Sequence, residues 1–152
     1  MKKPLILQVE DDPNDVFLFS RAFKKAQVDA DLHSIQDADE LLNYLTTLAE
    51  HGGQLPTLVL LDIKLPRKSG FDVLQWMRAH PAYKGVPVIM LTSSSQPLDV
   101  RRAYDLGANA YLVKPMDVDE IVRLLITIRD FWLSANIAPA TPNTLIASTS
   151  RA

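Results

Sequence analysis

Short apolar runs alternate along this chain with longer segments in which apolar residues recur every three or four positions. The first pattern is typical of buried strands, and the second is typical of helices that pack on one face. The chain therefore predicts five strands, at 5–9, 32–35, 58–61, 88–91 and 110–113. It predicts five helices between and after them, beginning near residues 13, 38, 70, 98 and 118, the last of them ending at 133.

The regular alternation of strand and helix predicts the fold class. Such a pattern implies a parallel sheet that helices cover on both faces. At this size the expected solution is a doubly wound, flavodoxin-like (βα)5 α/β sheet with strand order 2-1-3-4-5. We expect one domain over residues 1–133, and a polar tail containing Pro, Ser and Thr over residues 134–152.

Composition narrows the class of protein. The 152 residues are 47% hydrophobic and 22% charged, which suits one soluble domain. The absence of cysteine, of a signal-peptide core and of a long apolar span favours a cytoplasmic protein that binds no membrane. A net charge of −2 gives no indication of direct nucleic-acid binding.

Reactive side chains follow four of the five predicted strands. Glu10 and Asp11 follow the first strand, and Asp62 follows the third. Thr92 follows the fourth strand, and Lys114 follows the fifth. Because the carboxyl ends of parallel strands meet at one edge, and strands 1 and 3 are expected to be neighbours, the three acids should lie together.

This set of groups indicates phosphoryl transfer. Three carboxylates at close range repel one another, and Mg²⁺ relieves the repulsion while accepting phosphate oxygens. Asp62 would be the nucleophile that forms an acyl phosphate, with Lys114 and Thr92 donating to the other phosphoryl oxygens. Taken singly, each group could be a helix cap or a loop residue; Asp15 is interpreted as a helix-start residue, and Tyr111 as a packing residue. The joint pattern favours chemistry.

Four segments make the chain resemble the receiver domain of bacterial two-component response regulators, over roughly residues 4–133. The matching segments are Val9-Glu10-Asp11-Asp12, Leu61-Asp62-Ile63-Lys64-Leu65-Pro66 with Gly70, Leu91-Thr92-Ser93, and Tyr111-Leu112-Val113-Lys114-Pro115. The resemblance implies that Asp62 accepts a phosphoryl group from a histidine kinase. It implies that Thr92 and Tyr111 reorient on phosphorylation, and that Lys114 binds the phosphoryl group. It also implies a cis Lys114–Pro115 bond.

The same resemblance implies a set of Mg²⁺ ligands. Glu10 and Asp11 would hold the ion together with Asp62, Asp11 more directly than Glu10. The backbone carbonyl of Lys64 would complete the coordination.

A narrower resemblance concerns the stand-alone regulators that serve bacterial phytochrome kinases. It rests on segments that include Leu91-Thr92-Ser93-Ser94-Ser95, Ala103-Tyr104-Asp105-Leu106-Gly107-Ala108-Asn109-Ala110-Tyr111 and Asp130-Phe131-Trp132-Leu133. It implies that the partner is a histidine kinase of phytochrome type.

These observations predict a single-domain response regulator, not an enzyme with a diffusible substrate. One alternative is a Mg²⁺-dependent phosphatase of the haloacid dehalogenase type, which also uses an aspartyl phosphate. Its nucleophile follows the first strand and has a second Asp two positions later, whereas residue 64 is Lys here. The other alternative is a degenerate receiver that acts as a constitutive adaptor, and the intact acid, hydroxyl and lysine set argues against it.

With no effector domain in this sequence, output is expected through partner binding or dimerisation. We expect a homodimer through the face formed by helix 4, strand 5 and helix 5, which Thr92 and Tyr111 border. Phe131 and Trp132 point to different sides of the last helix, so one core cannot easily bury both. They are candidate anchors of the dimer; alternatively, one packs on the domain and the tail covers the other.

Overall fold

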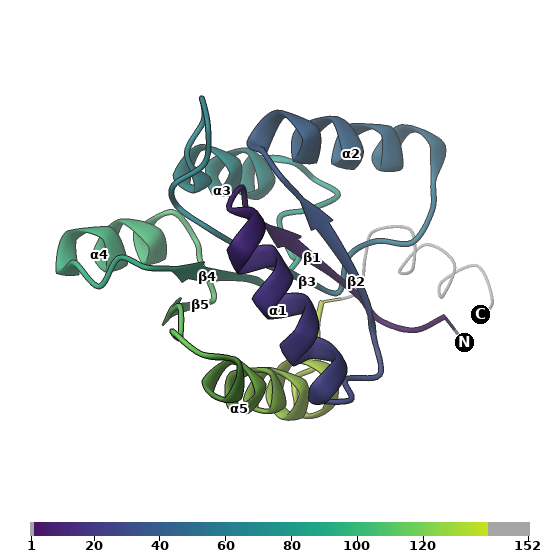
Figure 1. Ribbon diagram of the computed structural model, residues 1–152. Coiled ribbons are helices and arrows are strands. Elements are labelled where there is room, and N and C mark those ends of the chain that lie inside the picture. Colours follow the sequence, from purple (N-terminus) through teal and green to yellow (C-terminus); the bar gives the residue numbers. More distant parts are fainter. Residues whose placement is uncertain (1, 140–152) are drawn as a thin grey trace.

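A computed structural model describes residues 2–139, and residues 1 and 140–152 lie outside the description (Figure 1). Most of the predicted tail therefore lies outside the described residues. The strands are β1 Leu5–Val9, β2 Asp31–Ile35, β3 Leu58–Leu61, β4 Val88–Thr92 and β5 Ala110–Val113. The helices are α1 Pro13–Lys25, α2 Ala38–His51, α3 Gly70–Ala79, α4 Pro97–Asp105 and α5 Val118–Ile128, followed by a π-helical segment at Arg129–Ala135.

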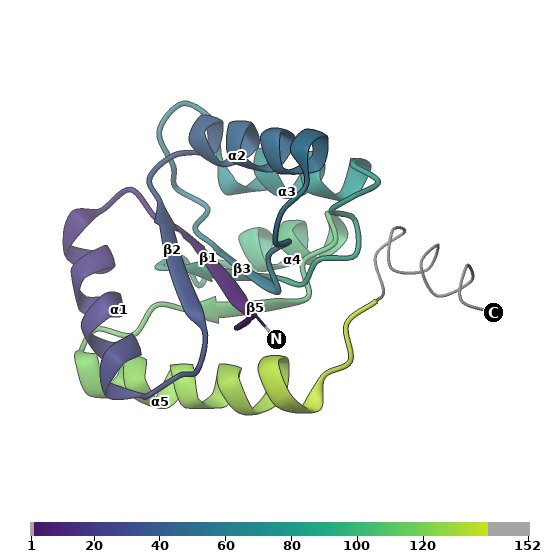
Figure 2. The same cartoon turned by 90° about the vertical axis from the view of Figure 1, so that its right-hand side faces the viewer.

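The five strands form one parallel sheet in the order β2-β1-β3-β4-β5, which confirms the predicted topology. Helices α1 and α5 pack against one face of this sheet, and α2 and α3 pack against the other (Figures 1 and 2). The three central strands are buried on both sides, which explains why their sequences are continuously apolar. No helix within residues 2–139 is long and apolar enough to cross a membrane.

Local capping explains why the helices begin and end where they do. The Asp12 side chain accepts from the backbone N–H of Asn14, and Asp37 caps α2 through the N–H of Glu40. Ser69 forms a reciprocal capping box at the start of α3. Gly107, with φ of 102°, supplies the left-handed turn that follows α4.

The end of the last helix differs from the prediction. Regular α-helix stops at Ile128, and wider π-helical turns continue to Ala135, two residues beyond the predicted end. The backbone N–H of Asn136 donates to the carbonyl of Phe131, the five-residue spacing of such turns. Trp132 packs against the core shared by α1 and α5. Phe131 is half exposed, and its ring lies edge-on to the ring of Trp132. The two aromatic side chains therefore do face different surroundings.

Candidate functional site

Asp62 is the first residue after β3, and it is buried, with 5% of its surface exposed. The chain folds back beneath it, and the N–H of Gly70 donates to the carbonyl of Ile63 at 2.8 Å. A Cβ at residue 70 would collide with the Asp62 carbonyl oxygen and lie 3.0 Å from the Ile63 Cα. Only glycine permits this close approach, so Gly70 fixes the loop that carries Asp62.

Three carboxylates meet at the carboxyl end of β1 and β3. Val9 is paired with Leu61 in the sheet, so the residues that follow them emerge side by side. One oxygen each from Glu10, Asp11 and Asp62 lies within 4.8 Å of the others. Glu10 is buried and Asp11 is exposed. The predicted strand order implies this proximity, and the structure has it.

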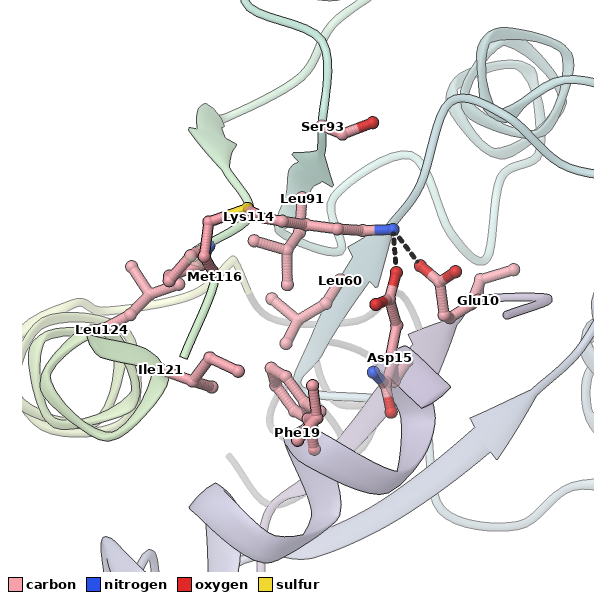
Figure 3. Close-up of a pocket in the computed structure, with 14 residues that line it drawn as sticks. Glu10, Asp15, Phe19, Leu60, Leu91, Ser93, Lys114, Met116, Ile121 and Leu124 are labelled. Atoms are coloured by element: carbon pink, nitrogen blue, oxygen red, sulfur yellow. Dashed lines mark hydrogen bonds and ion pairs between the residues drawn. The ribbon is translucent and has the colours of Figure 1, made fainter. Parts of the chain in front are cut away.

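Lys114 reaches this cluster from the end of β5. Its Nζ lies 2.5 Å from Glu10, 2.7 Å from Asp62 and 3.0 Å from Asp15, so one ammonium contacts three carboxylates. Figure 3 shows the contacts with Glu10 and Asp15. The backbone N–H of Lys114 donates to the Thr92 carbonyl at 2.8 Å, which fixes the start of the side chain.

The peptide bond between Lys114 and Pro115 is trans, so the expectation of a cis bond is wrong for this structure. The flexible four-carbon stem of the lysine is long enough to bring the ammonium to the acids from this backbone.

The stem of Lys114 lies along an apolar cavity of about 220 Å³ between α1 and α5 (Figure 3). The apolar side chains that line this cavity include Leu18, Phe19, Leu60, Leu91, Ile121 and Leu124. Because these apolar side chains offer the ammonium no hydrogen-bond acceptor, the neighbouring carboxylates bind it.

Burial and charge pairing shift the ionisation of these groups in opposite directions. Burial, together with the nearby charge of Asp62, raises the pKa of Glu10 to about 7. Burial also opposes ionisation of Asp62, but hydrogen bonds from Lys114 and Glu10 outweigh it and lower the pKa of Asp62. Although burial alone would lower it, the pKa of Lys114 is raised because both acids stabilise its charged form. These contacts favour an ionised Asp62 beside a charged lysine.

Thr92, at the end of β4, is fully buried, and its hydroxyl has no hydrogen-bond partner among the described residues. It adjoins the site, since the backbone carbonyl of Thr92 accepts from the N–H of Lys114. A buried hydroxyl without a partner costs stability, and a ligand oxygen at Asp62 would satisfy it.

Tyr111, on β5, is linked to the loop between β4 and α4. Its hydroxyl donates to the carbonyl of Ser94 at 2.8 Å, and the Ser94 hydroxyl donates to Asp99 of α4 at 2.6 Å. Burial, followed by the charge of Asp99, raises the pKa of Tyr111, so the hydroxyl stays a donor. The prediction that Tyr111 borders both β5 and the α4 region agrees with this placement.

The donor set fits a hard divalent cation. Carboxylate oxygens are the ligands that Mg²⁺ uses, and the site combines three of them with access to solvent through Asp11. Lys64, the fourth candidate, has an exposed side chain, and its backbone N–H lies 3.4 Å from an Asp62 oxygen. Its main chain is therefore beside the cluster.

The sequence interpretation of Asp15 is incomplete. Asp15 lies in the first turn of α1, as expected for a helix-start residue, but its carboxylate also binds Lys114. The two residues are 99 positions apart, so no local spacing could have indicated the pair.

Comparison with known proteins places this fold and site in one family. The model of the response regulator receiver domain matches residues 6–126. The chain belongs to the receiver family of response regulators.

Similar proteins cover nearly the whole chain. The probable methanogenesis regulatory protein FilR2 of Methanothrix harundinacea is 34% identical over 135 residues, 89% of this chain and 87% of FilR2. Response regulator Rcp1 of Synechocystis is 33% identical over 137 residues, 90% of this chain and 93% of Rcp1. One solved structure of Rcp1 is its Mn²⁺-bound form, with a TM-score of 0.74.

The phosphorylated cyanobacterial phytochrome response regulator RcpA has a TM-score of 0.82 to this receiver. The two are 31% identical, and the match covers 92% of this chain and 100% of RcpA.

Proposed function

We propose that this receiver accepts a phosphoryl group on Asp62 from a histidine kinase. An oxygen of Asp62 forms a bond to phosphorus while the bond between phosphorus and the kinase histidine nitrogen breaks. The histidine ring keeps the electron pair of that bond, takes a proton from solvent and leaves as neutral imidazole. The observation that carries the proposal is the buried Asp62 carboxylate 2.7 Å from the Lys114 ammonium, whose hydrogen bond lowers the pKa of Asp62. That geometry leaves a nucleophilic carboxylate beside a fixed positive charge.

We assign Mg²⁺ to Asp11 and Asp62 directly and to Glu10 largely through water, with the backbone carbonyl of Lys64 as a further ligand. Bound there, Mg²⁺ supplies charge neutralisation to the phosphoryl oxygens. The solved Mn²⁺-bound form of the similar Rcp1 supports binding of a divalent ion by this receiver. Lys114 and the free hydroxyl of Thr92 donate to the remaining oxygens.

The test is labelling with acetyl phosphate and Mg²⁺. Wild type should take up one phosphoryl group, and Asp62→Asn should take up none. Asp105→Asn, which removes an exposed carboxylate of α4, is the control and should label as wild type. Stoichiometric labelling of Asp62→Asn would refute the assignment, and an unlabelled wild type would favour the adaptor alternative.

We propose that the kinase is of phytochrome type. Rcp1 and RcpA support this partner, because RcpA is a phytochrome response regulator and both align along nearly their whole length. A panel of purified histidine kinases would test this partner. Fastest phosphoryl transfer from a kinase outside the phytochrome group would contradict the proposal. We place the reaction in the cytoplasm and the receiver at residues 1–133.

Thr92 and Tyr111 are proposed to carry the switch. When Thr92 donates a hydrogen bond to the phosphoryl group, the end of β4 and the loop that follows it are drawn toward that group. The hydrogen bond from Tyr111 to Ser94 then transmits this movement to α4. Thr92→Ala should still label but respond less to labelling. Partner binding or assembly that changes as in wild type would argue against this role.

A homodimer through α4, β5 and α5 is the proposed output. Leu98 is 81% exposed, and Tyr104, Val113 and Met116 add exposed apolar surface on or beside the same elements. β5 is an edge strand with no fully buried residue. Such a surface is typical of an interface.

Sedimentation with and without acetyl phosphate tests the dimer. Phosphorylation should tighten it by about ten-fold, within the usual range for linked sites. Leu98→Glu should weaken it, whereas Phe17→Glu, an equally drastic change of an exposed residue on α1, should not. A wild type that stays monomeric in both states would end the proposal. Trp132→Ala is expected to act mainly on stability, because Trp132 packs on its own core.

A further inference from the structure

Asp15 is a carboxylate of the site for which the phosphoacceptor reaction gives no role. Its Oδ2 lies 3.0 Å from the Lys114 Nζ, and 39% of its side chain is exposed, compared with 18% for Lys114. The contact joins the first turn of α1 to the end of β5 across the cavity mouth (Figure 3).

Capping does not account for Asp15. The cap of α1 is Asp12, whose side chain accepts from the N–H of Asn14 at 2.8 Å and whose carbonyl accepts from Val16. A negative charge in the first turn favours any helix, but that effect requires no lysine partner.

The ammonium of Lys114 has three N–H donors and three carboxylate neighbours, so each donor has one acceptor. Two of those acceptors, Glu10 and Asp62, also belong to the acid cluster that fits a cation. A bound cation would compete for their oxygens. Asp15 is the one neighbour outside that cluster, so its hold on Lys114 persists when the cluster is occupied.

We propose that Asp15 is a positioning residue that keeps the Lys114 ammonium beside Asp62 during phosphoryl transfer. This inference rests on the proposed function. A flexible lysine stem samples many rotamers, and a fixed anchor at its head pre-organises the charge that the phosphoryl group meets. Asp15 acts through Lys114 and does not touch the reacting atoms.

The first experiment measures the rate of labelling against acetyl phosphate concentration, with Mg²⁺ present. Asp15→Ala should lower the maximal rate constant by about three- to five-fold, the factor that a half-exposed ion pair contributes. A mere change in local charge would alter the half-saturating concentration of this anionic donor, not the maximal rate.

The control is Asp119→Asn, which removes an exposed carboxylate that pairs with Lys25 between α5 and α1. It should leave the maximal rate unchanged. In a Lys114→Ala background, Asp15→Ala should have no further effect, because its influence passes through the lysine.

A second readout does not depend on labelling. In the Mg²⁺-loaded protein, the Lys114 ammonium should give a protected ¹⁵N NMR signal that Asp15→Ala broadens by faster proton exchange. An equally protected signal in Asp15→Ala, or an unchanged maximal rate, would overturn the inference while leaving Asp62 as the acceptor. A wild type that fails to label would overturn the proposed function and this role together.

Discussion

The acid-bearing end of the sheet and the α4–β5 side of the molecule are built differently. All four residues of β3 are buried, and five of the ten residues of α3 are buried. In contrast, α4 buries only Ala103 among its nine residues, and β5 has no fully buried residue. The acids are held by backbone and lysine contacts, whereas α4 is held by few apolar side chains.

This difference suits a switch. Regions with few buried apolar contacts rearrange at low free-energy cost, while a packed region keeps its geometry. A change of charge at Asp62 is therefore expected to leave β3 in place and to move the α4–β5 side. The Tyr111–Ser94–Asp99 hydrogen bonds lie within the α4–β5 side, and Lys114, which follows β5 and contacts Asp62, joins that side to the acids.

The largest expected effect is at the acid-bearing end of the sheet. Gly70→Ala should lower the free energy of unfolding by about 4 kcal/mol, because its Cβ would collide with the Asp62 backbone. Gly85→Ala is the control, since its Cβ would meet Pro139 at 3.5 Å, an ordinary contact, and should change stability by less than about 0.5 kcal/mol. Urea unfolding measures both. A loss below about 1 kcal/mol in Gly70→Ala would show that the loop relaxes easily.

A pair of leucines compares α4 with a firmly packed helix, α5. Leu125→Ala on α5 should cost about 3 kcal/mol of unfolding free energy, because that side chain is 1% exposed. Leu98→Ala on α4 removes the same atoms from a side chain that is 81% exposed, and should cost less than about 0.5 kcal/mol. Equal losses in thermal or urea unfolding would mean that α4 is as firmly packed as α5.

The pH dependence of Mg²⁺ binding sharpens the description of the acid cluster. With a pKa of about 7, Glu10 is largely protonated below that pH in the metal-free protein. Protons and Mg²⁺ compete for this carboxylate, so affinity should rise as pH increases through 7, by at most about ten-fold per pH unit. The amide in Glu10→Gln cannot titrate, so this variant should show a flatter pH dependence of Mg²⁺ affinity. Calorimetry at several pH values measures it. An unchanged slope would assign the proton to another group.

The smallest expected effect is at a hydrogen bond within the α4–β5 side. Tyr111→Phe removes the hydroxyl that donates to Ser94 and should cost about 1 kcal/mol or less of unfolding free energy. Mg²⁺ affinity should not change, but the response of assembly to phosphorylation should weaken. Tyr44→Phe, at a half-buried tyrosine of α2 outside the proposed interface, is the matched control. A normal response in Tyr111→Phe would place the coupling elsewhere.

Much of the fold could be predicted because local patterns encode it. The bounds of β1, β3 and β5 agree with the predicted bounds, and α1, α2, α3 and α5 begin where the sequence predicts. The end of α5 was less predictable. A π-helical turn depends on how Trp132 packs against the α1 and α5 core, and local propensity does not report that packing.

Arg78 illustrates a set of long-range contacts that the sequence could not indicate. It looks like an ordinary basic residue of the last helical turn, yet its guanidinium donates to the carbonyls of Gly107, Tyr83, Lys84 and Val86 and to the side chain of Asn109. Burial lowers its pKa. These acceptors come from separate loops, so only the assembled fold makes Arg78 a connector.

The sequence by itself determined the order of the strands and the groups that follow them, because periodicity and chain order act through neighbours along the backbone. Glu10, Asp11 and Asp62 come together because β1 and β3 are neighbours in the sheet, as the strand order common at this size predicts. The tertiary structure decided which distant charges pair. The contact between Asp15 and Lys114 depends on how α1 lies against β5 and on the reach of one flexible side chain, and no pattern along the chain specifies either.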